Sequence, residues 1–480
     1  MNVEWLFHLP APVRRRLYFG LQRAVGSRLG EVWREFQSWE GLSSEGLKTR
    51  VEARLAETLS GAVQHNAYYR ELGLAPRSGE PATEFLRRFP ILPRPTVRAR
   101  FTDLVIDSLR HEITSPQSVA RRRYDWLVVK TGGTTGNPTT VVHDARARDW
   151  GRATRLFSAR QCGHPLGTRY FRLWGSETDL LQTQASLSLR VQAALLGYVP
   201  MNAFRSREAD LQRHYETMRQ HPEIDSLMTY VDAAVILARY IQDRKLRPPP
   251  LRTIMACAGT VTAESRAVLQ DVFGAEVFDK YGSRECCDVA CECRAHQGLH
   301  VYSPNVFLEV VDAAGASCVP GQTGRILVTL LNNPTFPLIR YEIGDVGQWA
   351  EPGRCGCGLA WPRLQSLQGR ADDMLLTEDG TLLSSVFVRH FVGVSLNRQL
   401  IREWQLEQTA SKRFVFRFIP VQTEGLAANL EIIQKSFRQV LGQSVAIEAR
   451  QVTELPLSAT GKMRWIINSV GQPEAAPPSA

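Results

Sequence analysis

In the stretch Trp126-Leu-Val-Val-Lys-Thr-Gly-Gly-Thr-Thr-Gly-Asn-Pro-Thr-Thr-Val-Val-His143, a loop rich in glycine and threonine separates two short β-branched runs. This pattern predicts a strand, a loop and a second strand. Gly132, Gly133 and Gly136 let the backbone approach a ligand closely, and the loop amides and threonine hydroxyls suit phosphate oxygens. The loop is not a P-loop, because Asn137-Pro138 stands in place of Gly-Lys-Ser/Thr. By itself it leaves two interpretations, an anion site or an ordinary surface turn.

The totals place the chain among globular proteins of more than one domain. It has 480 residues, with 44% hydrophobic and 22% charged residues. The net charge of +10 is spread along the chain, and only Arg14 to Arg16 and Arg121 to Arg123 form compact clusters. No aromatic and basic motif accompanies this charge, which disfavours nucleic-acid binding. Lysine is scarce beside arginine, so a lysine inside a motif is informative.

The N-terminus does not read as a targeting segment. Arg14 follows the apolar residues near Trp5 too soon for the order of charge, apolar run and cleavage site in a signal peptide. No apolar run is long enough for a membrane span. We therefore expect a cytoplasmic protein whose nine cysteines are thiols or metal ligands rather than disulfides.

Hydrophobic periodicity predicts an α/β domain up to about residue 350. Apolar residues recur every four positions from Leu47 to Val63 behind a possible cap at Ser43-Ser44, which predicts a helix. Further helices are predicted over 231–242 and 263–273.

Two buried strands are predicted beside the second of these helices, over 251–256 and 275–278. Each is expected to end in a loop, the first at 257–260 and the second at 279–285. Because ligands gather beyond the carboxyl ends of strands in α/β sheets, both loops are expected to face one crevice.

The character of the sequence changes after about residue 371. A strand over 414–419, a helix over 426–441 and a strand over 445–449 predict a small second unit. The expected domains are residues 1–371, residues 372–470 and a disordered tail over 471–480 that is rich in Ala, Pro and Ser.

Four further stretches follow the opening loop in order: Tyr281-Gly-Ser-Arg-Glu285, Tyr341-Glu-Ile-Gly-Asp345, Gly369-Arg-Ala-Asp-Asp373 and Leu457-Ser-Ala-Thr-Gly-Lys-Met-Arg464. Together they resemble the adenylate-forming superfamily of acyl-CoA synthetases. Within it, the chain looks most like the phenylacetate-CoA ligase family, including relatives associated with capsular polysaccharide loci. Pro337-Leu-Ile-Arg-Tyr341 and Gly298-Leu-His300 belong to the same likeness.

The resemblance implies an α/β fold with a large N-terminal domain of β-sheets and packed helices and a small, mobile α+β C-terminal domain. It implies an ATP- and Mg²⁺-dependent enzyme that activates a carboxylic acid, here an aryl acid, as an acyl-adenylate with release of pyrophosphate. The acyl group then passes to the thiol of CoA. A carrier-protein thiol, an amine or a sugar is the alternative acceptor. A nucleotide-binding protein without turnover is a third reading, against which Lys462 and Glu285 speak.

The resemblance also assigns the nucleotide-binding residues. Tyr281 would stack on adenine, Asp279 would accept from its amino group, and Ser283 would bond the α-phosphate. Glu285 would bind Mg²⁺ through hard oxygens. The ribose would lie at Asp345. The full expected set is Thr131, Gly132, Gly133, Thr134, Thr135, Gly136, Gly259, Asp279, Tyr281, Gly282, Ser283, Asp345 and Arg370.

By the same resemblance, Lys462 is the catalytic cation. It would bridge the carboxylate and the α-phosphate and stabilise charge that grows in the transition state. Asp372 stands at the hinge position, as a pivot for the small domain. The chain departs from the family at Asn137, where many relatives have lysine, and at Gly259, where many have an acidic residue.

Cys293, His296, Cys355 and Cys357 resemble a structural zinc set found in relatives with the same Cys-x-x-His and Cys-x-Cys pair. Reduced buried thiols are the alternative, and Cys291 would be a substitute ligand. Trp174 and Tyr230 are expected either to pack an aromatic acid or to belong to the core. The acid, its acceptor and the assembly, a homodimer included, remain open.

Overall fold

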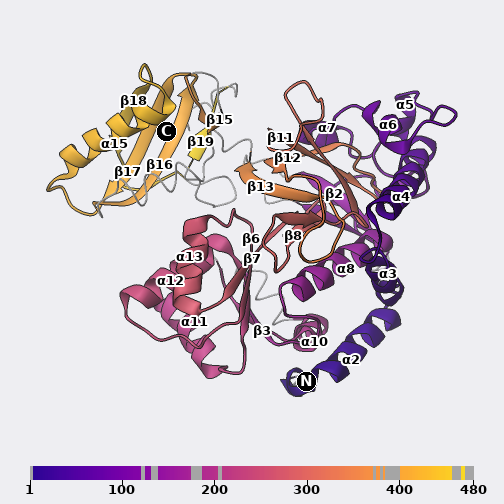
Figure 1. Ribbon diagram of the computed structural model, residues 1–480, viewed down its shortest axis with the longest axis horizontal. Coiled ribbons are helices and arrows are strands. Elements are labelled where there is room, and N and C mark those ends of the chain that lie inside the picture. The colour runs from indigo at the N-terminus through magenta and orange to yellow at the C-terminus, as the bar shows by residue number, and fades with distance from the viewer. Residues whose placement is uncertain are drawn as a thin grey trace. The chain divides into compact units, whose positions relative to one another are not determined.

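The computed structural model describes residues 4–120, 125–130, 139–174, 186–203, 208–370, 375–378, 382–383, 400–456 and 466–470. These residues form two compact units, which are described separately (Figure 1). The first contains the described residues up to Ser366 except Gly344–Val346, and the second contains Gly344–Val346 and the described residues from Leu367 onward. The expected boundary after residue 371 and the expected tail over 471–480 lie outside the described residues.

The opening stretch forms the two predicted strands. Strands β1 (Trp126–Lys130) and β2 (Thr140–Asp144) pair antiparallel, with Val128 opposite Val142. Helix α8 (Ala145–Gln161) follows β2 at once, and the Asp144 carboxylate caps it by accepting from the Ala147 amide at 2.8 Å. The strands are therefore confirmed, whereas the loop over 131–138 lies outside the described residues.

A mixed sheet is the centre of the first unit. Among the described residues, eleven strands form it in the order β10-β11-β12-β13-β9-β8-β7-β6-β5-β3-β4. The neighbours from β4 to β7 pair parallel, while β7, β8, β9 and β13 pair antiparallel. The bounds are β3 (Tyr170–Leu173), β4 (Tyr198–Met201), β5 (Ser226–Tyr230), β6 (Thr253–Cys257), β7 (Glu276–Ser283), β8 (Cys287–Glu292), β9 (Leu299–Val301), β10 (Val306–Val311), β11 (Thr323–Leu330), β12 (Tyr341–Trp349) and β13 (Arg363–Arg370).

Two hydrophobic cores lie against the parallel strands. One joins them to α11 (Glu208–Gln220), α12 (Val231–Asp243) and α13 (Ala263–Phe273), and includes Phe171 and Ile254. The other joins them to α8 and to the N-terminal helices, and is filled with aromatic side chains such as Phe157 and Trp361. The two predicted helices are confirmed as α12 and α13, because their apolar residues pack on the sheet.

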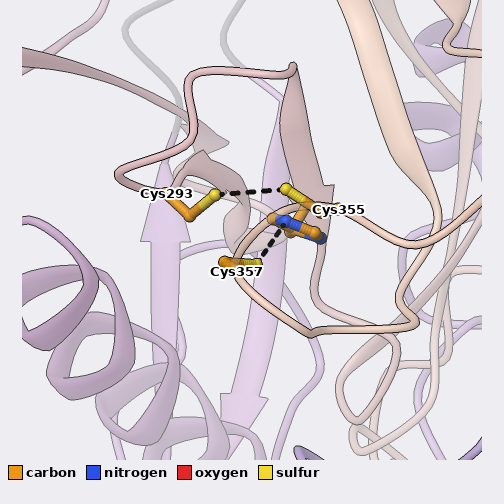
Figure 2. Close-up of side chains that lie close together, drawn as sticks. Cys293, Cys355 and Cys357 are labelled. Atoms are coloured by element: carbon orange, nitrogen blue, oxygen red, sulfur yellow. Dashed lines mark hydrogen bonds between the residues drawn. The ribbon is translucent and has the colours of Figure 1, made fainter.

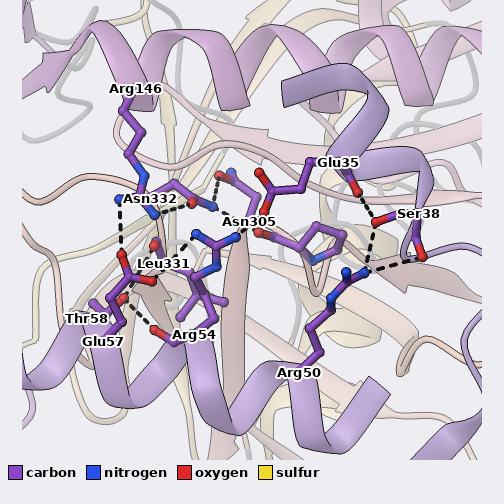
Figure 3. A network of polar contacts seen from close by, with 11 residues as sticks. Glu35, Ser38, Arg50, Arg54, Glu57, Thr58, Arg146, Asn305, Leu331 and Asn332 are labelled. Carbon is purple, nitrogen blue, oxygen red and sulfur yellow. Dashed lines mark hydrogen bonds and ion pairs between the residues drawn. The ribbon is translucent and has the colours of Figure 1, made fainter. Parts of the chain in front are cut away.

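Helices of the N-terminal third surround this second core. The helix predicted behind Ser43 is α4, whose N-cap side chain accepts from the Gly46 amide at 3.2 Å. Polar contacts fasten it, among them an ion pair of Arg54 with Glu35 (Figure 3). Arg146 on α8 bonds both to Glu57 of α4 and to Asn332, so α4 is fixed to segments far away in the sequence. The bounds are α1 (Glu4–His8), α2 (Ala11–Ala24), α3 (Leu29–Gln37), α4 (Ser44–His65), α5 (Ala67–Glu71), α6 (Ala82–Arg87), α7 (Arg94–Ala99), η1 (Asp107–Leu109) and, later in the chain, α10 (Leu187–Leu196).

One prediction about strand β7 was wrong. The strand was expected to end at residue 278, yet it continues through Ser283 and pairs with β8. Asp279 and Lys280 are poor strand formers, but each is buried and bonded to β8, through Glu292 and Asp288 respectively. Tertiary pairing thus overrides local preference here.

The second unit is a small α+β structure. Strand β17 and helix α15 match the predicted strand over 414–419 and helix over 426–441, and β18 follows them as predicted. Helix α15 packs on the sheet β18-β17-β16-β19 through Ile433 and Phe437. The bounds are β14 (Leu375–Leu376), β15 (Leu382–Leu383), β16 (Ile401–Ala410), β17 (Arg413–Pro420), α15 (Leu426–Leu441), β18 (Ala446–Gln451) and β19 (Ile466–Asn468). In neither unit is a described helix both long and apolar enough to cross a membrane.

Candidate functional site

The turn between β7 and β8 carries the carboxylate with the most constrained surroundings. Only Arg284, Glu285 and Cys286 connect the two strands. Gly282 is required there, because a Cβ would lie 2.4 Å from the Cys287 carbonyl oxygen. Cys287 completes the turn in a left-handed conformation with φ of 61°. This geometry turns Glu285 into the protein, where it is 3% exposed.

Glu285 meets groups from two distant segments. The Tyr341 hydroxyl at the start of β12 donates to Oε1 at 3.0 Å, and Arg94 Nη2 on α7 lies 4.0 Å from the same oxygen. Burial raises the pKa of Tyr341, which keeps it a hydroxyl donor. Among the described residues, Oε2 accepts no hydrogen bond. The arrangement fixes one carboxylate oxygen and leaves the other for a ligand.

The backbone of Glu285 is held as firmly as its side chain. His143 Nε2, at the end of the opening stretch, donates to the Glu285 carbonyl at 2.8 Å. Burial lowers the pKa of His143, so the ring is neutral and its donor is the Nε2 proton. Tyr69 holds the segment that leads to Tyr341 by donating to the Pro337 carbonyl at 2.8 Å.

Asp279, on β7, is a buried carboxylate with an unused oxygen. It is 6% exposed, and its Oδ1 has no hydrogen-bond partner among the described residues. Its amide donates to Glu292 Oε2 at 2.8 Å, and Arg266 on α13 holds Glu292 with two bonds of 2.9 Å. Burial raises the pKa of Asp279 to about 7, and the Glu292 charge adds to the rise. A buried acceptor without a donor points to a ligand with an N–H group.

This pKa predicts a pH-dependent stability difference for Asp279→Asn. The folded-state pKa is raised, so the unfolded state binds fewer protons between about pH 4 and 7 and wild-type stability falls as pH rises through that range. Above pH 7 the ionised Asp279 lowers the free energy of unfolding by about 4 kcal/mol at most, from roughly 3 pKa units at 1.36 kcal/mol each. Asparagine removes the cost, so the variant should gain stability over wild type from pH 4 to 7 in nucleotide-free unfolding experiments. A difference that does not vary with pH would contradict it.

Three cysteines and one histidine form a cluster beside this strand pair. Cys293 follows β8, and Cys355 and Cys357 lie in the loop before β13, with their sulfurs close together (Figure 2). With His300 on β9, their donor atoms all lie within 4.8 Å of one another. Cys293 Sγ and Cys355 Sγ are 3.5 Å apart, and Cys357 Sγ is 3.3 Å from His300 Nε2. In tetrahedral zinc these distances are about 3.8 Å and about 3.6 Å, so the donor set and spacing fit a structural zinc ion.

His296, the histidine expected in this set, is not part of it. Its Nε2 lies 3.2 Å from Glu276 and its Nδ1 lies 3.3 Å from Glu292, in an ion-paired position. The physical reason is the pairing of β8 with β9, which places His300 opposite Cys291 and brings its ring to the cysteines. Burial lowers the pKa of His300 to about 4, so its ring is neutral, as a metal ligand requires. The substitute ligand Cys291 lies instead 3.6 Å from Cys162.

The other residues of the expected site fall into four groups. Tyr281 and Ser283 lie on β7 with Asp279, and the Ser283 hydroxyl accepts from the Cys286 amide at 3.1 Å. Gly259 follows β6, just after Ala258 in a left-handed conformation with φ of 57°. Asp345 on β12 and the backbone of Arg370 on β13 belong to the second unit. The expected loop Thr131 to Gly136, the hinge Asp372 and the cation Lys462 lie outside the described residues.

Known proteins resemble this chain in sequence and in fold. A phenylacetate-coenzyme A ligase of Thermus thermophilus is 24% identical over 459 residues, which span 89% of this chain and 98% of that protein. The crystal structure of a 2-hydroxyisobutyryl-CoA ligase in the postadenylation state, in complex with R3-HIB-AMP, matches with a TM-score of 0.65 and 19% identity over 89% of this chain and 91% of that one. Residues 375–469 match the model of the CapK C-terminal domain.

The likeness to a CoA ligase over most of the chain, the matching fold and the CapK C-terminal match together support the adenylate-forming superfamily. A second structure of 2-hydroxyisobutyryl-CoA ligase, in an open conformation with 2-HIB-AMP and CoA, matches with a TM-score of 0.56 and 19% identity over 89% of this chain and 93% of that chain. The superfamily fold accounts for both units, the large one with its mixed sheet and the small α+β one.

Sequence reasoning missed several groups around the expected nucleotide site. Tyr341 was recognised only as the start of a motif, and its contact with Glu285 was not foreseen. Arg94 stood in a proline-punctuated segment that gave no sign of a charge near Glu285. No role was predicted for Glu292, which stands between two cysteines, although on β8 its carboxylate accepts from the Asp279 amide. His300 was quoted only within the Gly-Leu-His likeness, and the structure places its ring with the three cysteines.

Proposed function

We propose that this protein uses ATP and Mg²⁺ to convert a carboxylic acid to its acyl-adenylate and then passes the acyl group to the thiol of CoA. The observation that carries this proposal is Glu285, a buried carboxylate anchored at one oxygen by Tyr341 and open at the other. Such a group is a hard oxygen ligand for Mg²⁺. It lies on the same hairpin as Asp279, whose Oδ1 has no hydrogen-bond donor among the described residues.

The relatives support the same reaction. The protein of Thermus thermophilus is named a phenylacetate-coenzyme A ligase, and the 2-hydroxyisobutyryl-CoA ligase was solved with 2-HIB-AMP and CoA. Both names contain an acid and CoA, the solved structure adds an adenylate of its acid, and the two acids differ. We therefore carry over the reaction class and not the substrate.

In this proposal, β7 and its turn bind the nucleotide. Asp279 Oδ1 accepts from the adenine amino group, Tyr281 stacks on the ring, and Ser283 bonds the α-phosphate. Glu285 Oε2 binds Mg²⁺, which supplies neutralising charge at the phosphates. The loop Thr131 to Gly136 holds the terminal phosphates, and Asp345 with Arg370 holds the ribose. Asp372 is the hinge of the small unit.

The proposed reaction has two steps, adenylate formation and thioester formation. In the first, a carboxylate oxygen attacks the α-phosphorus, a new P–O bond forms, and the bond to the bridging oxygen breaks as pyrophosphate leaves. Lys462 stabilises the negative charge that gathers between the carboxylate and the phosphate. In the second, the CoA sulfur attacks the acyl carbon, a C–S bond forms, the C–O bond to AMP breaks, and the thiol proton passes to solvent.

The cysteine cluster is proposed as a structural zinc site made by Cys293, His300, Cys355 and Cys357. Four protein donors close a tetrahedral site and leave no position for a substrate. The zinc would brace the nucleotide site, because Cys293 directly follows Glu292, whose carboxylate binds the Asp279 amide.

Metal analysis of protein purified without added metal should find about one equivalent of zinc per chain. His300→Ala should lower this content to about a tenth or less, because three donors hold zinc far more weakly than four. His296→Ala is the matched control and should keep its zinc. Full zinc in His300→Ala together with loss in His296→Ala would restore the ligand set expected from sequence.

Pyrophosphate release tests the proposed function. The full chain with ATP and Mg²⁺ is screened against aryl and aliphatic acids, with and without CoA. Release that depends on one acid supports adenylation, and formation of a CoA thioester supports CoA as acceptor. Acid-dependent release without a thioester would favour a carrier-protein thiol, an amine or a sugar. No release with any acid, from folded protein that binds ATP, would overturn the proposal.

A further inference from the structure

The parallel strands place four side chains in one row at their carboxyl ends. Tyr230, the last residue of β5, is the register partner of Cys257, the last residue of β6. Leu173 pairs with Thr229 and Ala256 pairs with Asp279, so one step further along the strands Trp174 lies level with Tyr230, and Cys257 with Lys280. Side chains alternate along a strand, so this row faces away from Asp279. Ligands of open α/β sheets bind at such strand ends.

Two aromatic rings and two cationic side chains lie close together in or next to this row. The Trp174 and Tyr230 ring centroids are 4.4 Å apart. The Lys280 ammonium lies 5.7 Å from the Trp174 ring, and the Arg172 guanidinium lies 5.5 Å from it. The negative face of an aromatic ring attracts cations, and such a ring also packs on a further aromatic group in an offset or edge-to-face arrangement.

Lys280 is an ammonium with unused donors. It is 7% exposed, and it is one of only seven lysines in the chain. One of its three N–H groups donates to Asp288 Oδ1 at 3.0 Å, and no other acceptor contacts it among the described residues. Although burial lowers the pKa of an ammonium, Asp288 raises that of Lys280 above its ordinary value. A permanent charge with unused N–H groups in a buried place calls for another acceptor.

Among the described residues, the positive and negative charges around Lys280 and Arg172 do not balance. Lys280 pairs with one carboxylate, Asp288, whose second oxygen accepts from Ser158 Oγ at 3.1 Å. Arg172 Nε is buried and has no hydrogen-bond partner among the described residues. Counted over the part of the chain that the structure describes, the surplus is positive and lies next to two aromatic rings, so the complementary ligand is flat and rich in oxygen.

From this row we infer that Lys280 determines specificity, and that the acid is aromatic and carries a second oxygen acceptor, a hydroxyl or a second carboxylate, bound by the Lys280 ammonium. Trp174 and Tyr230 pack its ring. The inference rests on the proposed function, because it names the acid of that reaction. It places the acid on the opposite face of β7 from Asp279, so one strand serves both substrates.

The test compares acids with and without the acceptor. Pyrophosphate release by the full chain is measured with benzoate and phenylacetate, and separately with their hydroxylated and their carboxylated derivatives. Wild type should prefer one substituted acid over its parent by about tenfold or more in kcat/KM. Lys280→Met should bring this ratio close to one. The separate hydroxyl and carboxylate arms then identify the acceptor.

Controls keep the result readable. Lys280→Met leaves Asp288 unpaired, so Lys280→Met/Asp288→Asn serves as the charge-balanced version if the single variant does not fold. Lys48→Met, at an exposed position on α4, should keep the wild-type ratio. A wild type that prefers the parent acids, or a preference that persists in the folded Lys280 variants, would overturn the inference.

A second readout separates this inference from the proposed function. The same acids are titrated without ATP while the melting temperature is followed. If no acid releases pyrophosphate, the proposed function fails, and the melting data decide the inference alone. A larger shift with a substituted acid than with its parent, lost in the Lys280 variants, supports it. Equal shifts in wild type and variants overturn it.

Discussion

Glu285→Gln is expected to slow acyl-adenylate formation by about 100-fold or more, because the variant loses the negative charge that we propose binds Mg²⁺. Glutamine has the shape of glutamate, and its amide oxygen still accepts from the Tyr341 hydroxyl, which lies 3.0 Å from Oε1 in the wild type. The backbone contact with His143 does not depend on the side chain. The loss therefore reports the charge and not a collapse of the turn.

The measurement is the rate of pyrophosphate release as a function of Mg²⁺ concentration. The variant should need more Mg²⁺ for half its maximal rate as well as reach a lower maximum. Tyr341→Phe removes only the hydroxyl and should cost about tenfold, the scale of one hydrogen bond to a charged group. Glu84→Gln, at an exposed position on α6, is the control and should behave as wild type. A Glu285→Gln enzyme within tenfold of wild type, with the same Mg²⁺ dependence, would remove Glu285 from the metal site.

Lys462→Ala should lower the rate of adenylate formation by about 100-fold to 10,000-fold while ATP affinity changes little. The reacting carboxylate and α-phosphate are both negative, and the charge between them grows in the transition state. An ammonium stabilises that state more than the separate ground states, so its loss acts on the rate and not on binding.

Two quantities test this assignment, the single-turnover rate of pyrophosphate release and the Kd for ATP. Lys435→Ala is a matched control, because Lys435 is an exposed lysine on α15 of the same unit and should keep both values. Unchanged pyrophosphate release in Lys462→Ala would defeat the catalytic role. An equal loss in rate and in ATP affinity would instead make Lys462 a nucleotide-binding residue.

The elements with a strong local signal were predictable from sequence. Helix α13 begins and ends at the predicted residues, since Thr262 caps it and Gly274 ends it in a left-handed conformation. Strands β1 and β2, and the order of β17, α15 and β18 in the small unit, followed from β-branched runs and helical periodicity. The superfamily was recognised because its motifs are short, local and ordered along the chain.

Predictions failed where distant segments decide the outcome. Strand β7 continues beyond its expected end because it pairs with β8, which buries Asp279 and Lys280. The local strand propensity of these two residues does not favour this. His296 stood at the right spacing from Cys293, but Glu276 and Glu292 hold it, while the pairing of β8 with β9 brings His300 to the sulfurs.

By itself the sequence determined the helices and strands with clear periodicity, the motif residues and the superfamily, because these are properties of residues near one another in the chain. Only the tertiary structure decided the fourth donor of the cysteine cluster, the contact of Tyr341 with Glu285 and the row of Trp174, Tyr230 and Lys280. Each of these depends on strand register and burial across tens to hundreds of residues. Such pairings are fixed by the free energy of the whole fold and have no local trace.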